Sequence, residues 1–305
     1  MLNIWIRAAR LRTLPLSVSG VILGGAAAAS EGAFRPAVFA LSVLTALLLQ
    51  ILSNFANDYG DYTHGTDGAG RVGPSRAVSS GDISPRAMFR AVLLFSCLSA
   101  LSAIALFWVS FGLNPVRWGA FAVLGGASIA AALFYTMGRH PYGYNGLGDF
   151  FVFVFFGLVA VCGAYALYPE APLSRLPGLP ACATGLFATA VLNVNNIRDM
   201  ENDRASGKET LALRLGALGA RRYHLALIGL GLLCWVVYLV GTERFRILPG
   251  LLAALPLVLS AKTVFCTTLP EVLDAQLRRT SISAGLFNLL MAVLLIWQSG
   301  VFLAW

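Results

Sequence analysis

Long apolar runs, separated by short charged, proline-rich or glycine-rich segments, recur along all 305 residues and constrain the fold more than any other feature. The chain is 58% hydrophobic and only 12% charged, with a mean hydropathy of +0.75. Soluble domains carry about 25% charged residues. The sequence therefore predicts an all-α polytopic membrane protein, because an apolar run crosses a bilayer as a helix that satisfies its own backbone hydrogen bonds.

Nine runs are long enough to be candidate spans, and we expect them to form one transmembrane domain over residues 1–305. They cover 14–30, 36–56, 87–110, 116–137, 147–168, 179–199, 217–240, 247–266 and 282–303. The preceding segment, 2–11, has the pattern of an amphipathic helix on the membrane surface. The alternative is that the first thirty residues are a cleaved signal peptide.

The basic residues are sorted to one side of this predicted topology. Of the 22 Lys and Arg residues, only five fall on the side opposite the amino terminus: Arg35, Arg117, Arg175, Arg244 and Arg246. Since loops rich in Lys and Arg stay in the cytoplasm, we expect a cytoplasmic amino terminus and an external carboxy terminus. The net charge of +8 then reflects topology and lipid contact rather than nucleic-acid binding.

Two polar stripes interrupt the apolar pattern, at the ends of the second and sixth spans. The first consists of Asn54, Asn57, Asp58 and Asp61, and the second of Asn195, Asn196, Asp199 and Asp203. Spacings of three and four residues place each stripe on one helix face. Because a carboxylate in a membrane costs several kcal/mol unless it is paired, two such stripes indicate a shared cationic ligand.

The chemistry of the stripes favours magnesium bound together with a diphosphate. Mg²⁺ takes one or two carboxylates plus phosphate oxygens, and Asp58, Asp61, Asp199 and Asp203 supply hard oxygen ligands. Matched stripes in two halves predict a pseudo-symmetric bundle that encloses a cavity, with one carboxylate cluster facing the other. The alternative for any single Asp is a helix cap or a solvated residue.

Basic residues near the stripes can neutralise a diphosphate. We expect this role for Arg71, Arg139, Arg198 and Lys208, although the positive-inside bias also explains part of their placement. A third polar region links the fourth and fifth spans, where Tyr135 and Asp149 flank a turn rich in Gly and Tyr.

These motifs resemble the UbiA superfamily of intramembrane prenyltransferases, and within it the 1,4-dihydroxy-2-naphthoate polyprenyltransferases of menaquinone synthesis. The resemblance covers nearly the whole chain. It is carried by four stretches: the two acidic motifs at 57–67 and 196–212, and the finer signatures at 71–78 and 143–149. One position departs from the superfamily pattern, since Gly65 stands where a third Asp is expected: either Asp67 takes over that role, or the first motif holds magnesium with fewer carboxylates. The resemblance also implies a cavity that opens to the cytoplasmic side and laterally to lipid, in the cytoplasmic (inner) membrane of a bacterium.

The resemblance implies Mg²⁺-dependent transfer of a polyprenyl group from its diphosphate to 1,4-dihydroxy-2-naphthoate, with loss of carbon dioxide, to give a demethylmenaquinol. Asp58, Asp61, Asp199 and Asp203 would hold the metal. Asp67, Asp149 and Tyr135 would act on the acceptor. The diphosphate would be bound by Asn54, Asn57, Arg71, Arg139, Asn195, Asn196, Arg198 and Lys208.

Three alternatives compete with this prediction. Another superfamily enzyme, such as one acting on 4-hydroxybenzoate, would share the metal site and differ in the acceptor pocket. An ion-coupled transporter also has repeated halves and intramembrane Asp residues, but its sites lie near the midplane. The segment 146–149 matches the GxGD pattern of intramembrane aspartyl proteases, yet the fourth span lacks the partner Asp.

The five scattered cysteines indicate neither a disulfide nor a zinc site, and no pattern indicates an oligomeric state.

Overall fold

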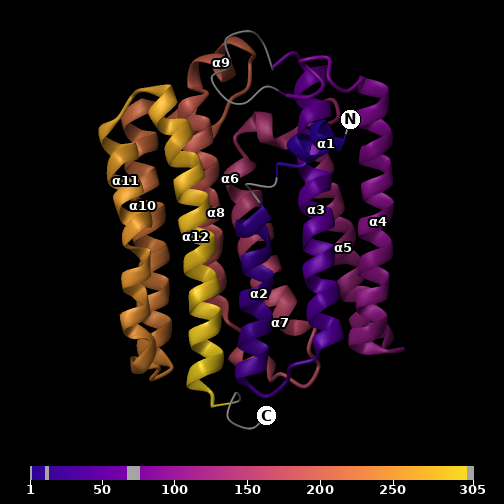
Figure 1. Cartoon of the computed structure of the whole chain (residues 1–305), viewed down its shortest axis with the longest axis vertical. Coiled ribbons are helices and arrows are strands. Elements are labelled where there is room, and N and C mark those ends of the chain that lie inside the picture. The colour runs from indigo at the N-terminus through magenta and orange to yellow at the C-terminus, as the bar shows by residue number, and fades with distance from the viewer. Residues whose placement is uncertain (1, 11–13, 67–75, 301–305) are drawn as a thin grey trace.

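The computed structural model describes residues 2–10, 14–66 and 76–300, and within these ranges the regular structure is entirely helical. The helices run side by side along one axis (Figure 1). In chain order the α-helices are α1 (Leu2–Ala8), α2 (Leu14–Ser30), α3 (Pro36–Thr63), α4 (Pro85–Phe111), α5 (Pro115–Phe134), α6 (Gly148–Val152), α7 (Ala164–Ala166), α8 (Gly178–Arg198), α9 (Met200–Ala205), α10 (Leu211–Gly241), α11 (Leu255–Cys266) and α12 (Pro270–Gln298). Other helical types form η2 (Tyr142–Asn145), η3 (Phe153–Gly163), η4 (Leu173–Arg175) and η5 (Phe245–Ala254).

Each of the nine predicted spans overlaps a helical segment, but fewer than nine meet a strict criterion for crossing a membrane. Among the described residues, seven helices are long and apolar enough to do so. The helix α2 is apolar but has only 17 residues, and α8, which carries Asn193, Asn195 and Asn196, is not among the seven. The chain is an integral membrane protein, and the count of nine spans stays a prediction.

Two predicted boundaries were wrong. The second span was expected to end at 56, but α3 continues to Thr63 and carries Asn57, Asp58 and Asp61 within the helix. The last span was expected to begin at 282, but α12 starts at Pro270. Proline fits the first turn of a helix, where its missing N–H is not needed. In both cases the helix includes polar residues that a span delimited by hydropathy alone leaves out.

The helices form two groups joined by a central layer. In Figure 1, α3, α4 and α5 lie on one side, and α10, α11 and α12 on the other. The helix α8 packs against α10, α12 and η3, and α2 packs against α12 and η3, so α2, α8 and η3 connect the groups. Edge-to-face contacts of Phe287 with Phe187 and with Trp235 fill the core between α8, α10 and α12, where all three side chains are almost fully buried.

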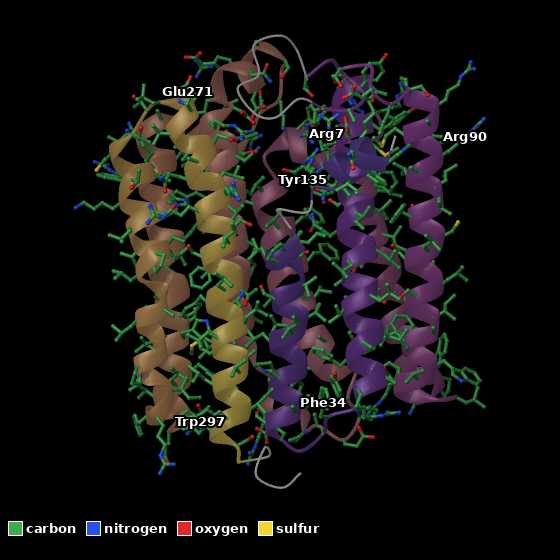
Figure 2. All side chains as sticks on the ribbon, in the orientation of Figure 1. Arg7, Phe34, Arg90, Tyr135, Glu271 and Trp297 are labelled. Carbon is green, nitrogen blue, oxygen red and sulfur yellow. The ribbon has the colours of Figure 1, made fainter. Side chains whose placement is uncertain are left out.

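The two ends of the bundle differ in their charged side chains. Figure 2 places Arg7, Arg90, Tyr135 and Glu271 toward one end, and Phe34 and Trp297 toward the other. At the second end Glu31 accepts ion pairs from Arg175 at 2.8 Å and Arg244 at 3.5 Å. Three of the five arginines expected on the far side, Arg35, Arg175 and Arg244, therefore pair with acidic residues of that side, Glu31 or Glu170.

Candidate functional site

The first acidic segment lies on the last turns of α3, and its two carboxylates have different partners. Asp58 is 1% exposed and accepts backbone N–H bonds from Ala77 at 3.1 Å and Val78 at 3.3 Å. Asp61, one turn further on, accepts a charged hydrogen bond from Arg76 Nη2 at 2.9 Å and another from the Tyr144 hydroxyl at 2.8 Å. Asp58 thus anchors the chain that follows the loop, whereas the partners of the Asp61 carboxylate among the described residues are side chains.

The second acidic segment lies where α8 ends and α9 begins. Asp199 has φ −97° and ψ 8°, which is not helical, and it separates the two helices. The Arg198 guanidinium binds both oxygens of Asp199, at 2.7 and 2.6 Å, and also Asp274 at 2.6 Å and Asn195 Oδ1 at 2.9 Å. Its side chain is 1% exposed, so these partners compensate the cost of burying the charge.

Asp203 and Lys208 form the other half of this segment. Lys208 Nζ lies 3.7 Å from Asp203 Oδ1, and both residues are buried. The chain returns to Asp203 because Gly207 adopts φ +72°, a conformation that favours glycine, and Lys208 N–H then donates to the Asp203 carbonyl at 2.9 Å.

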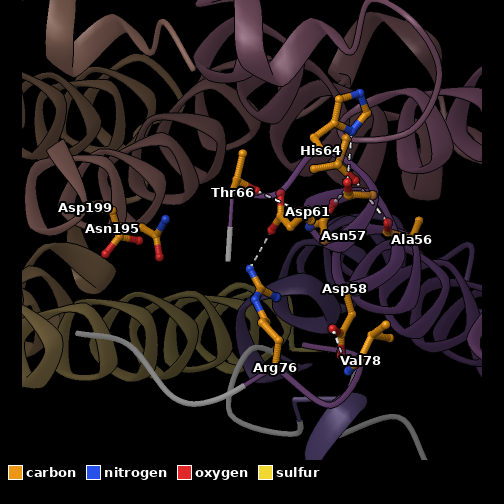
Figure 3. Close-up of polar contacts among 12 residues, drawn as sticks. Ala56, Asn57, Asp58, Asp61, His64, Thr66, Arg76, Val78, Asn195 and Asp199 are labelled. Carbon is orange, nitrogen blue, oxygen red and sulfur yellow. Dashed lines mark hydrogen bonds and ion pairs between the residues drawn. The ribbon is translucent and has the colours of Figure 1, made fainter. Parts of the chain in front are cut away.

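Tyr144 of η2 joins the two segments. Its hydroxyl donates to Asp61 and lies 3.0 Å from the Thr66 hydroxyl, while Lys208 Nζ sits 5.2 Å from the centre of its ring. Asn202 of α9 adds a direct link between the segments by donating to the Thr66 carbonyl at 2.8 Å. Figure 3 shows Asp61 between Thr66 and Arg76, with Asn195 and Asp199 on the other side of the view.

The third polar region supplies Tyr135 and Asp149 beside this junction. The Tyr135 ring lies against Gly143 and Gly148: a β-carbon at Gly143 would come within 2.6 Å of the Tyr135 carbonyl oxygen, and one at Gly148 within 3.2 Å of the ring. Gly143 is therefore required for the close approach, and a side chain at position 148 would need the Tyr135 ring to shift by a few tenths of an ångström. Asp149 is buried in the first turn of α6, near enough to Tyr135 to act on it electrostatically.

A cavity of about 330 Å³ begins at this polar region and runs between α2, α3, α4, α5 and η3. Its polar lining gathers around Asn54, Asn57 and Tyr135, and most of the remaining lining is apolar or carries single hydroxyls. Asn57 precedes Asp61 by one helical turn on the same face of α3, so the cavity ends within about one helical turn of Asp61, which is not itself a lining residue. A polar head with an apolar tail fits this arrangement.

The structure brings most of the predicted site residues together, but not all of them. Asp67 and Arg71 lie outside the described residues. Arg139 is exposed, and no ion pair to it is found in the part of the chain that the structure describes. Asn54 donates to the Ala9 carbonyl at 2.9 Å, and Asn196 is buried with its side-chain oxygen lacking a hydrogen bond to the described residues.

Sequence reasoning missed Asn202 and Asp274. It noted the tyrosines of the turn between the fourth and fifth spans only as a group and did not single out Tyr144. Arg76 was not among the residues expected to bind the diphosphate. Asp274 carried no signal in the sequence, since it lies in a segment that was expected to be a loop and is instead the first turns of α12.

The residues present fit a magnesium diphosphate better than a metal held by protein alone. Within the described ranges, no three His, Cys, Asp or Glu side chains converge as a ready metal cluster. Asp61, Asp199 and Asp203 are instead buried hard-oxygen donors, each facing a cation, and Asn196 adds a buried amide oxygen. Mg²⁺ needs only one or two such carboxylates when phosphate oxygens complete its shell.

Comparison with known proteins agrees with this geometry. Residues 18–271 match the UbiA prenyltransferase family. The chain is 43% identical over 301 residues to the 1,4-dihydroxy-2-naphthoate octaprenyltransferase of Escherichia coli strain K12, covering 98% of this chain and 95% of that protein.

Two solved structures share the fold. An apo UbiA homologue from Aeropyrum pernix K1 superposes with a TM-score of 0.67 at 19% identity, covering 93% of this chain and 97% of the other. A UbiA homologue from Archaeoglobus fulgidus, bound to GPP and Mg²⁺, superposes with a TM-score of 0.56 at 16% identity over 96% and 99% of the two chains. The chain belongs to the UbiA prenyltransferase family.

Proposed function

We propose that this enzyme transfers a polyprenyl group from polyprenyl diphosphate to 1,4-dihydroxy-2-naphthoate, with Mg²⁺ as the cofactor. The observation that carries the proposal is the junction at Tyr144, where Asp61 and the Asp203–Lys208 pair meet beside the mouth of an apolar cavity. The naphthoate acceptor rests on the 43% identity to the bacterial octaprenyltransferase. The products are demethylmenaquinol, diphosphate and carbon dioxide.

The carboxylates and cations divide the binding of the donor between them. Asp61, Asp199 and Asp203 would hold Mg²⁺, and when bound the metal supplies positive charge for the departing diphosphate. Arg76 and Lys208 face these carboxylates, and we assign them, together with Arg71 and Arg139, to binding the phosphate oxygens. Asn57 and Asn196 add amide groups. Asp58 and Arg198 have their polar atoms engaged within the protein, and we assign them to positioning of the ligands.

The basic side chains of the protein favour cleavage of the carbon–oxygen bond in the polyprenyl diphosphate. As the bond from the allylic carbon to the diphosphate oxygen breaks, negative charge builds on the leaving group, and the cations stabilise it. The allylic cation then bonds to the ring carbon that carries the carboxylate, and the carbon–carboxylate bond breaks to release carbon dioxide. We assign removal of the proton of an acceptor hydroxyl to Asp149, which is buried near Tyr135, with Asp67 as the second candidate.

We place the end that holds Arg7, Arg90 and Glu271 in the cytoplasm of a bacterial cell, because it carries most of the Lys and Arg residues. The nine spans then leave the carboxy terminus outside, and the whole chain acts as one domain. The prenyl chain and the surrounding lipid are its apolar partners. A single cysteine at 299 that reacts with an impermeant thiol reagent from the cytoplasmic side would contradict this topology.

A direct assay tests the function. Purified protein in lipid nanodiscs is given octaprenyl diphosphate with either dihydroxynaphthoate or 4-hydroxybenzoate, with Mg²⁺ or with EDTA. We expect prenylated naphthoquinol, diphosphate and carbon dioxide in equal amounts, only with Mg²⁺ and only with the naphthoate. Prenylation of hydroxybenzoate but not of dihydroxynaphthoate would overturn the acceptor, and full activity in EDTA would overturn the metal.

A further inference from the structure

The cavity has two unlike walls. Every residue that lines it from α6 and η3 is apolar or glycine. Six of the eight residues that line it from α3 are polar: Ser42, Thr45, Gln50, Ser53, Asn54 and Asn57. A polyprenyl chain is a hydrocarbon and needs no polar wall, whereas a substrate with hydroxyl groups needs hydrogen-bond partners when it leaves water. The polar wall therefore fits the acceptor, and the apolar wall fits the prenyl chain.

Ser99, on the helix α4 that packs against α3, has a buried hydroxyl without a protein partner. Ser99 lines the cavity, is 0% exposed, and its Oγ makes no hydrogen bond to the described residues. Two other hydroxyls in the lining bond back to their own helices: Ser42 donates to the Val38 carbonyl at 2.7 Å, and Ser128 to the Leu124 carbonyl at 2.8 Å. A buried hydroxyl without a partner is costly, so Ser99 Oγ is suited to a hydrogen bond with a ligand.

Two contacts between α3 and α4 fix the depth of Ser99 in the bundle. Nearer the polar end of the cavity, the rings of Phe55 and Phe95 meet edge to face, with 5.2 Å between their centres. Farther from that end, the hydroxyls of Thr45 and Ser102 lie 2.8 Å apart. Ser99 lies between Phe95 and Ser102 on α4. Its hydroxyl is therefore in the helix-lined part of the cavity, some distance inward from the carboxylates of the site.

Polar residues of α3 continue inward to the depth of Ser99. Gln50 and Ser53 lie between the same two contacts on α3, and both line the cavity. Gln50 Nε2 donates to Asn54 Oδ1 at 3.4 Å, so the polar face is continuous at this depth. Gln50 precedes Asn57 by seven residues, which is about 10 Å along a helix. A rigid ligand of about this length can therefore have one polar end near Asn57 and another polar group near Ser99.

The proposed reaction decides which part of the acceptor reaches this depth. The ring carbon that is alkylated must lie beside the allylic carbon, which is attached to the diphosphate at the polar end. That ring carbon carries the carboxylate, and one ring hydroxyl is on the carbon next to it. The other ring hydroxyl is further round the same ring, remote from the carboxylate. It therefore points inward along the polar wall, toward the depth of Gln50 and Ser99.

We propose that Ser99 binds the acceptor hydroxyl that is remote from the carboxylate, and that this hydrogen bond selects an acceptor with two ring hydroxyls. The proposal rests on the proposed function and specifies how its acceptor is recognised. A hydroxyl brought out of water to this depth needs a partner, and Ser99 Oγ supplies one that has no other bond among the described residues. A site built to bind a substrate hydroxyl rejects an analogue that lacks it, because the protein group is then left unpaired.

The test compares two acceptors in two variants. 1,4-Dihydroxy-2-naphthoate is the substrate, and 1-hydroxy-2-naphthoate, which lacks only the remote hydroxyl, is the competing ligand. Ser99→Ala removes the proposed partner, and Ser128→Ala removes a lining hydroxyl that is already bonded to its own helix.

We expect Ser99→Ala to lower kcat/KM for dihydroxynaphthoate by roughly 5- to 20-fold, mainly through KM for the acceptor. The inhibition constant of the monohydroxy compound and KM for octaprenyl diphosphate should change by less than about twofold. Ser128→Ala should leave all three values unchanged. Equal losses for the two naphthoates, or no loss for dihydroxynaphthoate, would overturn the proposal.

Thermal unfolding separates acceptor binding from a role in the fold. Ser99→Ala removes a buried hydroxyl without a protein partner, so the unfolding temperature of the unliganded variant should equal or exceed that of the native protein. Dihydroxynaphthoate should raise the unfolding temperature of the native protein and of Ser128→Ala more than that of Ser99→Ala. A lower unfolding temperature of unliganded Ser99→Ala would assign the hydroxyl to the fold and overturn the proposal. If the native protein did not prenylate dihydroxynaphthoate at all, the proposed function itself would be wrong.

Discussion

The two acidic segments are matched in sequence, but the structure holds their carboxylates in different ways. In the first, α3 is continuous through Asp61, and the partners come from distant parts of the chain, Arg76 and Tyr144. In the second, the helix breaks at Asp199, and most partners are sequence neighbours, Arg198 and Lys208. The first segment therefore depends on tertiary structure, whereas the second is largely self-contained.

This difference assigns separate tasks to residues that look equivalent in the sequence. Asp58 and Asp61 are one turn apart, yet backbone N–H groups engage both oxygens of Asp58, and side chains that can move engage those of Asp61. A carboxylate that is to bind a metal must be able to exchange partners. We therefore expect Asp61 to contribute to the chemistry and Asp58 to the fold.

The largest effect is expected for Asp61→Asn, which removes a proposed metal ligand and the charge facing Arg76. Loss of one such electrostatic group lowers kcat by about 10²–10³. Turnover is measured with saturating Mg²⁺ and octaprenyl diphosphate. Asp82→Asn, which alters a surface ion pair with Arg7, serves as the matched control and should keep normal turnover. Near-normal turnover in Asp61→Asn would remove the first segment from the metal site.

A smaller loss is expected for Tyr144→Phe, because the ring over Lys208 remains and only the hydroxyl is removed. Hydrogen bonds to charged groups contribute about 1.5–3 kcal/mol, so kcat/KM should fall by roughly 10- to 100-fold. Tyr62→Phe changes an exposed tyrosine near the same end of α3 and should have no effect. If the two variants behaved alike, Tyr144 would not couple the segments.

Asp58→Asn should reveal the structural role of its carboxylate. The new amide N–H₂ would face a backbone donor, which costs about 1–3 kcal/mol, so thermal unfolding should begin at a lower temperature. Activity measured well below that temperature should fall by less than tenfold, about 1.4 kcal/mol, and so far less than in Asp61→Asn. A normal unfolding temperature combined with an activity loss as large as that of Asp61→Asn would reverse the assignment of the two residues.

The smallest effect is expected for Asp274→Asn. Arg198 would keep both bonds to Asp199 and its bond to Asn195, so the second segment should hold its shape, and kcat should fall only about two- to fivefold. Glu271→Gln, on the exposed first turn of α12, is the control. A loss as large as that of Asp61→Asn would show that the second segment also depends on distant partners.

The sequence predicted an all-helical membrane protein and placed the two polar stripes on helices, because long apolar runs and helical spacing are local signals. It did not predict Tyr144 as the junction or Asp274 as a partner of Arg198, since both contacts join residues far apart in the chain. Hydropathy also ended α3 too early, because Asn57, Asp58 and Asp61 are polar residues on a helix whose tertiary partners compensate them.

The central claim is that the two segments form one site, and a double-mutant cycle tests it most directly. We would measure kcat/KM for octaprenyl transfer to dihydroxynaphthoate in Asp61→Asn, Asp203→Asn and the double variant. Residues that act as a unit are strongly non-additive, so the double variant should lose little more than the worse single variant, with a coupling of about 1–3 kcal/mol. Losses that simply multiply would contradict a single shared site.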